Sequence, residues 1–266
     1  MHTQAWALIT GASSGLGVEF AHQLAAQGYN LLLVARREAV MQQLARQLER
    51  RHGIRCHTFA QDLSQPGADI RLVGELDLLA LVPDLLINNA GVGCFGPFIA
   101  QDHERIQAML QLNMHTLTGL TQLVAQRMQA RGSGSILLIS SIAAFLPLPG
   151  YAAYGASKAF VLQWGVALRE ELKDCGIHVS VLAPGMTRTA FFDIARQPIT
   201  PFWNHFMLPA ANVVAAGLHG LRQSRAIIVP GWYNRILTCC SQLLPRGVLA
   251  WVAKRLLQVN TDSGVS

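Results

Sequence analysis

Residues 10–17 read TGASSGLG and directly follow the apolar run AWALIT at residues 5–10. A segment of helical periodicity then extends to about Gln27. The three glycines of this stretch allow a tight turn and a close approach of the backbone to a ligand. The free N–H groups at the start of the helix would then face an anion such as a pyrophosphate. A glycine-rich turn can also simply join a strand to a helix, but the strand–turn–helix context favours dinucleotide binding.

The pattern continues along the chain as apolar runs of strand length that alternate with helical segments. Near-continuous apolar strands separated by helices are typical of a parallel sheet covered on both faces, and right-handed crossovers make it doubly wound. We find no internal repeat or linker, so residues 1–266 are expected to form one domain. The predicted strands are 5–10, 30–35, 55–61, 85–88, 135–140, 177–183 and 226–229. The predicted helices include 15–27, 38–52, 66–80, 102–130 and 151–173.

The composition excludes several classes of protein. Of the 266 residues, 51% are hydrophobic and only 14% are charged, which excludes a disordered chain. The counts of 23 glycines, 11 prolines and 5 cysteines exclude a collagen-like chain and a disulfide scaffold. No uninterrupted apolar run reaches the roughly 18 residues typical of a membrane span. The net charge is +6, but the basic residues are dispersed, so nucleic-acid binding is not predicted.

The cysteines indicate the redox compartment. They are unevenly spaced and form no CxxC pair, so no metal site is predicted. We expect small, mostly buried thiols in a reducing cytosol. The first strand begins within a few residues of Met1, which leaves no room for a signal peptide and favours a cytoplasmic protein. The cysteines are Cys56, Cys94, Cys175, Cys239 and Cys240.

Two arginines, Arg36 and Arg37, follow the second predicted strand, where a carboxylate would bind the ribose hydroxyls of NAD. Arginines instead favour a 2′-phosphate through charge-assisted contacts. The alternative is a solvated charge pair at the start of a helix. The sequence therefore predicts NADP(H) in preference to NAD(H).

Polar residues also follow the third and fourth predicted strands. Asp62-Leu63 ends the third, and NNAG at residues 88–91 ends the fourth. Ligands of doubly wound sheets bind outside the carboxyl ends of the strands, so both segments are expected to face the cofactor. Asn89 could also bond backbone groups in the turn, and the two roles are compatible.

A third constellation combines Ser140-Ser141 with YGASK at residues 154–158. Tyr154 and Lys158 are four residues apart, so their side chains share one face of a helix. A nearby ammonium favours the phenolate and lowers the pKa of a phenol, which suits a general acid/base. A serine from the neighbouring strand could then hydrogen-bond the substrate oxygen. Taken alone, a YxxxK spacing is common.

The chain resembles the short-chain dehydrogenases/reductases in five motifs that occur in that family's order: TGASSGLG, NNAG, a serine thirteen residues before the tyrosine, YGASK and PGMTRT at residues 184–189. The resemblance covers about residues 5–229. It implies an α/β fold of the three-layer Rossmann type with a doubly wound seven-stranded parallel sheet and a helical C-terminal extension. It also implies hydride transfer between NAD(P)(H) and a carbonyl or alcohol, and a homodimer or homotetramer.

Carried over by motif, the catalytic residues are Asn113, Ser141, Tyr154 and Lys158. Tyr154 matches the acid/base and Ser141 the substrate-binding serine, whereas Ser140 is out of register and is expected to be structural. Lys158 matches the lysine that binds the nicotinamide ribose, and Asn113 resembles the asparagine that holds a water in the proton relay. The expected cofactor-binding residues are Gly11, Ser13, Ser14, Gly15, Leu16, Gly17, Arg36, Arg37, Asp62, Leu63, Asn89, Ala90, Gly91, Tyr154, Lys158, Pro184, Gly185, Thr187 and Thr189.

Two segments bear on the substrate. Residues 190–210 contain several aromatic side chains, which favours an apolar lid over the substrate, or alternatively an ordinary pair of core helices. Residues 231–259 form an apolar and basic C-terminal extension. It could cover the pocket, pack on a partner subunit or make peripheral contact with a membrane surface.

The sequence predicts an NADPH-dependent reductase of an apolar ketone, for example a 3-oxoacyl thioester. One alternative is an NADP-dependent dehydrogenase that oxidises a steroid-like or other lipophilic alcohol. The other is a non-catalytic NADP(H)-binding regulatory protein, against which the intact catalytic set argues. The substrate is assigned by analogy, because a fold does not fix a substrate.

Overall fold

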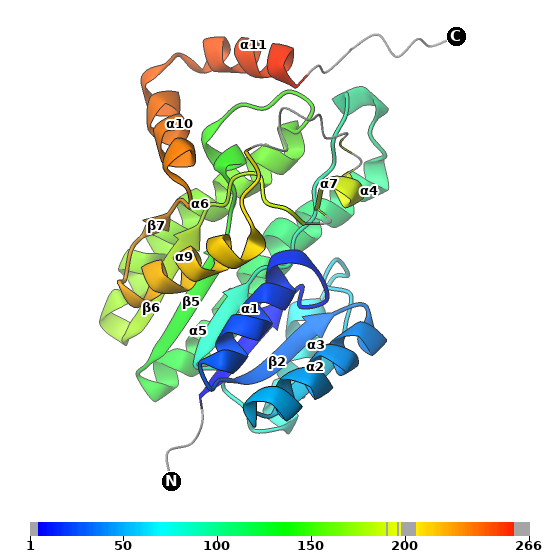
Figure 1. The fold of residues 1–266 in the computed structure, drawn as a ribbon, viewed down its shortest axis with the longest axis vertical. Coiled ribbons are helices and arrows are strands. Elements are labelled where there is room, and N and C mark those ends of the chain that lie inside the picture. Colours follow the sequence, from blue (N-terminus) through cyan, green and yellow to red (C-terminus); the bar gives the residue numbers. More distant parts are fainter. Residues whose placement is uncertain (1–4, 190, 196, 198–205, 258–266) are drawn as a thin grey trace.

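A computed structural model describes residues 5–189, 191–195, 197 and 206–257. The chain forms three layers, with one parallel sheet between two layers of helices (Figure 1). The strand order is β3-β2-β1-β4-β5-β6-β7, so the predicted seven-stranded, doubly wound parallel sheet is confirmed. The strands are β1 Trp6–Thr10, β2 Asn30–Ala35, β3 Cys56–Ala60, β4 Leu85–Asn88, β5 Gly134–Ile139, β6 Ile177–Leu182 and β7 Ile227–Ile228.

The helices cover the two faces of the sheet in separate sets. Apolar residues of α1, α2 and α9 pack on one face, and those of α3, α5 and α6 pack on the other. These helices are α1 Gly15–Ala26, α2 Glu38–His52, α3 Ala68–Leu78, α5 Leu117–Arg131, α6 Ala152–Leu172 and α9 Ala210–Arg222. The smaller elements are η1 Phe98–Ala100, α4 His103–Leu110, η2 Gln111–Thr116, η3 Ile142–Phe145, η4 Lys173–Cys175 and α7 Phe191–Ala195.

Strand β2 shows why the apolar runs are continuous. Successive side chains of a strand point to opposite faces, and here each face is covered by helices. Leu31 and Leu33 accordingly join the core beneath α1, α2 and α9, whereas Leu32 and Val34 join the core on the other side. Both faces of the strand therefore require apolar residues.

The strand order reverses between β1 and β4, and this reversal places the candidate site. Because sequential strands leave in opposite directions from this point, a crevice opens outside the carboxyl ends of β1 and β4. The Thr10 hydroxyl accepts hydrogen bonds from the backbone N–H groups of Asn89 and Ala90, both at 2.9 Å. The Asn89 amide donates to the Thr10 carbonyl at 2.8 Å. These bonds hold the loops after the two strands together.

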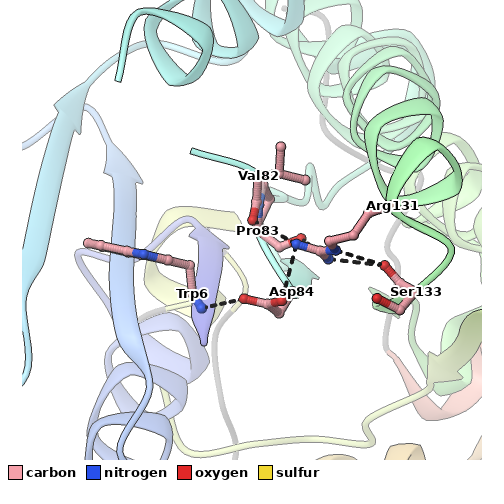
Figure 2. A network of polar contacts seen from close by, with 6 residues as sticks. All are labelled: Trp6, Val82, Pro83, Asp84, Arg131 and Ser133. Atoms are coloured by element: carbon pink, nitrogen blue, oxygen red, sulfur yellow. Dashed lines mark hydrogen bonds and ion pairs between the residues drawn. The ribbon is translucent and has the colours of Figure 1, made fainter. Parts of the chain in front are cut away.

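At the opposite, amino-terminal edge of the sheet, Arg131, the last residue of α5, holds neighbouring loops together (Figure 2). Its guanidinium donates to the carbonyls of Val82 and Pro83, both at 3.1 Å, and to that of Ser133 at 3.0 Å. It also forms an ion pair with Asp84, N to O 3.1 Å. Asp84 in turn accepts a 2.7 Å bond from the Trp6 N–H at the start of β1.

Two expectations from the sequence are corrected. The predicted helix over 102–130 is interrupted, because η2 between α4 and α5 is a turn of π-helix. The prediction of mostly buried thiols is wrong, since only Cys94 is buried and Cys239 and Cys240 are exposed. Both exposed thiols lie on a C-terminal helix whose apolar residues are largely exposed.

The C-terminal extension begins with α10, Trp232–Leu243, and continues with α11, Arg246–Leu256. Figure 1 shows both helices beyond the carboxyl ends of the strands, on the side of the molecule that carries α7. Within the described ranges, we find no helix with the length and hydropathy needed to cross a bilayer.

Candidate active site

The glycine-rich turn after β1 is shaped for close contact with a ligand. Gly11 has φ +68°, and a Cβ there would lie 2.9 Å from the Asn89 amide nitrogen. Ser14 caps α1 in an extended conformation without a side-chain bond to the helix, and the first turn contains no acidic residue. The N–H groups and positive end of the helix dipole therefore remain available to an anion. Gly17 serves packing, because a Cβ there would lie 2.1 Å from the Gly11 carbonyl oxygen.

The two predicted arginines differ in their contacts. Arg37 lies against the glycine-rich turn, where its Nε donates to the Ser13 hydroxyl at 3.2 Å and its Nη2 to the Ser13 carbonyl at 2.7 Å. Arg36 is exposed near Asp62. Burial acts to raise the pKa of Asp62, but hydrogen bonds from Ser64 and the charge of Arg36 bring it below its usual value. Both cations thus stand at the carboxyl ends of β2 and β3.

The loop after β4 lies between the glycine-rich turn and the side chains of Asn113 and Lys158. A Cβ on Gly91 would lie 3.0 Å from the Lys158 ammonium nitrogen and 3.2 Å from the Asn113 side-chain oxygen. Only a glycine lets this loop pass so close to both groups without displacing them. The predicted residues Gly91, Asn113 and Lys158 are therefore neighbours, although they come from three separate elements.

Tyr154 and Lys158 lie in the first two turns of α6, on its buried side. The Lys158 nitrogen stands 5.9 Å from the centroid of the Tyr154 ring and donates to the Ile139 carbonyl at 3.0 Å. Ser141, just after β5, hydrogen-bonds the Tyr154 phenol and accepts from the Ala143 N–H at 3.1 Å. Ser140 instead donates to the Lys158 carbonyl at 2.7 Å, in keeping with the structural role expected for it.

Burial dominates the titration of this pair. It raises the pKa of Tyr154 to about 12, against the opposing effect of the Ser141 hydrogen bond. It lowers the pKa of Lys158 from 10.5 to about 8. The tyrosine pKa is thus raised in the structure, although the nearby ammonium predicts a lowered one. Desolvation of both charged forms outweighs their mutual attraction at this separation.

Asn113 lies in the π-turn and is fully buried. Its oxygen accepts from the Val92 N–H at 3.1 Å, and its nitrogen donates to the Val92 carbonyl at 3.0 Å and to the Ser157 hydroxyl at 3.1 Å. π-Turns often occur at functional sites, where the extra residue redirects a side chain. Here the turn places Asn113 against the loop after β4 and the buried side of α6.

One cavity of about 320 Å³ joins the two halves of the site. The predicted residues that line it are Gly11, Ser14, Gly15, Leu16, Asn89, Ala90, Gly91, Ser141, Tyr154, Lys158, Pro184, Gly185, Thr187 and Thr189. Ser13, Gly17, Arg36, Arg37, Asp62, Leu63 and Asn113 are outside this lining. Of these seven, Asn113 is buried behind Gly91 and Gly17 lies in the first turn of α1, whereas the other five belong to the glycine-rich turn and to the segments after β2 and β3.

The cavity has an apolar wall that sequence analysis only partly identified. Phe191 and Phe192 of α7 belong to it, and the rings of Phe191 and Tyr154 are 5.3 Å apart. Tyr151 also lines it and donates a 2.6 Å hydrogen bond to Gln197. Its spacing of three residues from Tyr154 was an available signal, because i and i+3 share a helix face. Of the predicted 190–210 lid, residues 190, 196 and 198–205 lie outside the described residues.

Two residues of the C-terminal extension complete the lining. Leu237 of α10 and Leu257, directly after α11, both contribute to the cavity. The extension therefore reaches the site, as one of its three predicted roles requires. No local motif marks these two leucines among the many apolar residues of 231–259.

Comparisons with known proteins agree with this geometry. The model of the short chain dehydrogenase family matches residues 5–199. Over 236 residues the chain is 40% identical to a very-long-chain 3-oxoacyl-CoA reductase of Neurospora crassa, an alignment that covers 87% of this chain and 70% of the relative. It is 30% identical over 240 residues to human 17-beta-hydroxysteroid dehydrogenase type 3, covering 85% and 76%. A solved short-chain dehydrogenase from Sphingobium yanoikuyae in complex with NADPH superposes with a TM-score of 0.81 at 30% identity, covering 98% of both chains.

Proposed function

The chain belongs to the short-chain dehydrogenase family, and from this premise we propose that it reduces the ketone of a long-chain 3-oxoacyl thioester with NADPH. It is an oxidoreductase acting on CH–OH and C=O groups. The proposal takes its substrate class from the fungal reductase that is 40% identical. It takes its cofactor from the NADPH-bound bacterial structure and from the two arginines after β2.

The observation that carries the proposal is the composition of the cavity that contains Tyr154. Its lining includes the turn glycines and the open start of α1, which suit a pyrophosphate. It also includes Ser141, Tyr154 and Lys158, together with several phenylalanines and leucines. A ketone flanked by an alkyl chain fits this combination of polar, reactive and apolar surfaces.

In the proposed reaction each residue acts on the substrate oxygen or on a neighbouring group. NADPH, when bound, supplies the hydride. Tyr154 donates its proton to the carbonyl oxygen, which Ser141 holds and polarises through a hydrogen bond. Lys158 stabilises the phenolate that remains and would hold the nicotinamide ribose. Asn113 fixes the loop after β4 and the position of Ser157, and we assign it the resupply of the proton through water. Positioned proton transfer of this kind contributes about 10²–10⁴-fold to the rate.

The raised pKa of Tyr154 suits its proposed role as the acid in a carbonyl reduction. With a pKa raised to about 12, the phenol keeps its proton at neutral pH. A carbonyl reduction needs that protonated form as its acid, whereas alcohol oxidation needs the phenolate as its base. The steroid-type alcohol dehydrogenase is kept as the second candidate, because the chain is also 30% identical to the human hydroxysteroid enzyme.

The test is a panel of ketones with NADPH consumption as the readout. We expect turnover of a long-chain 3-oxoacyl-CoA to exceed that of acetoacetyl-CoA and of a steroid ketone. Tyr154→Phe is expected to lower turnover by about 10²–10⁴-fold while NADPH binding persists. Preferred oxidation of a steroid alcohol with NADP would select the second candidate. NADPH binding without turnover of any member would support the regulatory protein instead.

For assembly and location we propose a homodimer or homotetramer in the cytoplasm. The five free cysteines are consistent with a reducing compartment. Sedimentation equilibrium of the purified chain tests the oligomeric state, and a monomer at micromolar concentration would contradict it.

A further inference from the structure

Helix α10 has an inverted distribution of polar and apolar residues. Its buried residues are Asn234, Thr238 and Ser241, whereas Trp232 is 73% exposed and Leu243 is 83% exposed. A surface helix of a water-soluble protein normally shows the opposite arrangement, with apolar residues inward. Packing within this chain therefore does not explain the outer face of α10.

The buried polar groups of α10 are satisfied by backbone carbonyls of α10 itself and the residues just before it. Asn234 donates to the Pro230 carbonyl at 2.7 Å, Thr238 to that of Arg235 at 3.0 Å, and Ser241 to that of Thr238 at 2.8 Å. Because each polar side chain already has an acceptor nearby, none of them requires water or a partner. The helix can thus bury a polar face at little cost and present its apolar face outward.

Helix α11 continues this outer surface. It contains no buried residue, and Trp251 is 58% exposed. Val248, Trp251, Val252 and Leu256 recur at three- and four-residue spacing on one exposed face. The guanidinium of Arg255 lies 4.5 Å from the centroid of the Trp251 ring, so a cation borders the apolar face. Aromatic residues beside cations are typical of helices that lie at a membrane interface.

The charge of the extension has one sign. Residues 231–259 contain four cations and no aspartate or glutamate. All four are exposed in the structure. They are Arg235, Arg246, Lys254 and Arg255. Such a surface is complementary to anionic lipid headgroups, which attract nearby Lys and Arg side chains.

We propose that the outer face of α10 and α11 docks on an anionic bilayer surface, and that the apolar substrate enters the cavity from that surface. The second part rests on the proposed function, because it assumes a lipophilic substrate. Docking and substrate entry are connected because the helices of the docking face also reach the site. Leu237 of α10 and Leu257 after α11 line the cavity that contains Tyr154. Helices that face the bilayer therefore also form the wall of the site.

A second copy of the chain fits this face less well than a bilayer does. In a twofold interface the same surface is used by both subunits, so residue i of one faces residue j of the other and the reverse. Cations without any intervening acid would then face cations across the axis. The resulting repulsion would oppose the apolar contact, whereas an anionic bilayer neutralises it.

The test is flotation of the full chain with phosphatidylcholine vesicles that contain about one third phosphatidylserine, and with pure phosphatidylcholine vesicles. We expect the chain to float with the anionic vesicles and much less with the neutral ones. Replacing Arg246, Lys254 and Arg255 by Gln is expected to weaken partitioning about fivefold for each cation, on the order of 100-fold in all. Trp232→Ser with Trp251→Ser is expected to weaken binding to both kinds of vesicle.

The matched control removes three exposed cations from the far side of the molecule, as Arg46→Gln, Arg50→Gln and Arg51→Gln on α2. The control should float like the unaltered chain. An equal loss in the control would show non-specific attraction and overturn the proposal. A second outcome would also overturn the proposal. If the chain does not float, and if the Trp232→Ser and Trp251→Ser variant dissociates an oligomer that the unaltered chain forms, the outer face of α10 and α11 is an interface between copies of the chain.

Substrate delivery is tested separately with a vesicle-embedded and a water-soluble 3-oxoacyl thioester. The α11 cation variant should lose activity on the embedded substrate and keep it on the soluble one. Equal activity on both would overturn delivery from the bilayer. Flotation without reduction of either substrate would contradict the proposed function and leave the docking proposal standing. Reduction without flotation would contradict the docking proposal and leave the proposed function standing.

Discussion

Lys158 is a lysine held where its charge is poorly solvated. It is 4% exposed, and its ammonium donates to the Ile139 carbonyl beneath the loop that carries Gly91. Desolvation makes the charged form unfavourable, which is why the pKa of Lys158 falls to about 8. A side chain positioned to stabilise a phenolate thus destabilises the fold in the absence of ligands.

We expect Lys158→Met to stabilise the ligand-free protein at neutral pH. The folded pKa of about 8 lies below the unfolded value of 10.5, so the unfolded chain binds the extra proton between these values. The cost of the buried charge is complete below pH 8, at most about 3 kcal/mol, and is relieved as pH rises toward 10.5. Urea unfolding of both proteins from about pH 7 to about pH 10 would measure the difference.

The stabilising effect of Lys158→Met should shrink across that window. The raised pKa of Cys56 makes both proteins less stable at higher pH, but it acts on both proteins alike and cancels in the difference. The pKa of Tyr154 is raised from 10.0 to about 12, so its titration affects stability only above about pH 10, beyond the measured window. A difference that stays constant with pH would show that the folded and unfolded chains bind the Lys158 proton equally, and it would refute the lowered pKa of Lys158.

At this scale the sequence predicted which side chains meet but not how they titrate. The spacing of Tyr154 and Lys158 places both on one helix face, and the structure brings Ser141 to them. The pKa of Tyr154 depends on its burial, to which the ring of Tyr151, three residues earlier, and the ring of Phe191, 37 residues later, both contribute. The contact with Phe191 has no local signal in the sequence.

At the scale of elements, the π-turn at Gln111–Thr116 is the clearest difference from expectation. The segment 102–130 has unbroken helical periodicity, and its single glycine, Gly119, lies outside the π-turn. The π-turn coincides with the contacts of Asn113 with Val92 and Ser157. Those partners lie 21 and 44 residues away in the sequence, so periodicity alone predicts one straight helix.

The contacts of the Arg131 guanidinium support a prediction about how much they stabilise the packing of the strands and helices. Arg131→Ala removes donors from the carbonyls of Val82, Pro83 and Ser133 and the partner of Asp84 (Figure 2). We expect the free energy of unfolding to fall by about 1–2 kcal/mol, because the site is partly exposed and water replaces part of the loss. Urea unfolding measures the change, and NADPH affinity should be unaffected at this opposite edge of the sheet.

The variant Arg131→Lys distinguishes the contribution of the positive charge from that of the planar arrangement of donors. A lysine keeps the attraction to Asp84 but cannot supply several donors in one plane. We therefore expect it to recover only a minor part of the stability lost in Arg131→Ala. Full recovery would mean that the loops before β4 and β5 are stabilised by the ion pair with Asp84 rather than by the hydrogen bonds to the three carbonyls.

At the scale of the whole molecule, the topology follows from the order of the apolar runs, and all seven strands were predicted within about two residues at each end, a typical error for element boundaries. The parts that could not be predicted lie where distant segments meet. The exposed thiols of Cys239 and Cys240 are an example, because α10 turns its polar residues inward. A pattern of apolar residues predicts that a face is buried, but it does not say whether protein or lipid covers it.

The preference for NADPH or NADH can be measured as a change in the stability of the folded chain when each cofactor binds. A ligand that binds only the folded state at about 100 times its Kd raises the free energy of unfolding by about 2.7 kcal/mol. For a chain of this size that corresponds to a rise in Tm of about 5–10 °C. We expect NADPH to give such a rise and NADH a smaller one at the same concentration, because only NADPH offers the 2′-phosphate to Arg36 and Arg37.

Separate substitutions of the two arginines should then divide their roles. Arg36 is exposed and near Asp62, so Arg36→Ala should reduce the Tm shift with NADPH and leave the shift with NADH unchanged. Arg37 is bonded to the Ser13 hydroxyl and carbonyl, so Arg37→Ala should loosen the glycine-rich turn and reduce both shifts. Arg46→Ala on the outer side of α2 is the control and should change neither shift. If Arg36→Ala lowers the NADPH and NADH shifts equally, the contact with the 2′-phosphate is refuted, because the lost interaction would then involve a group that both cofactors share.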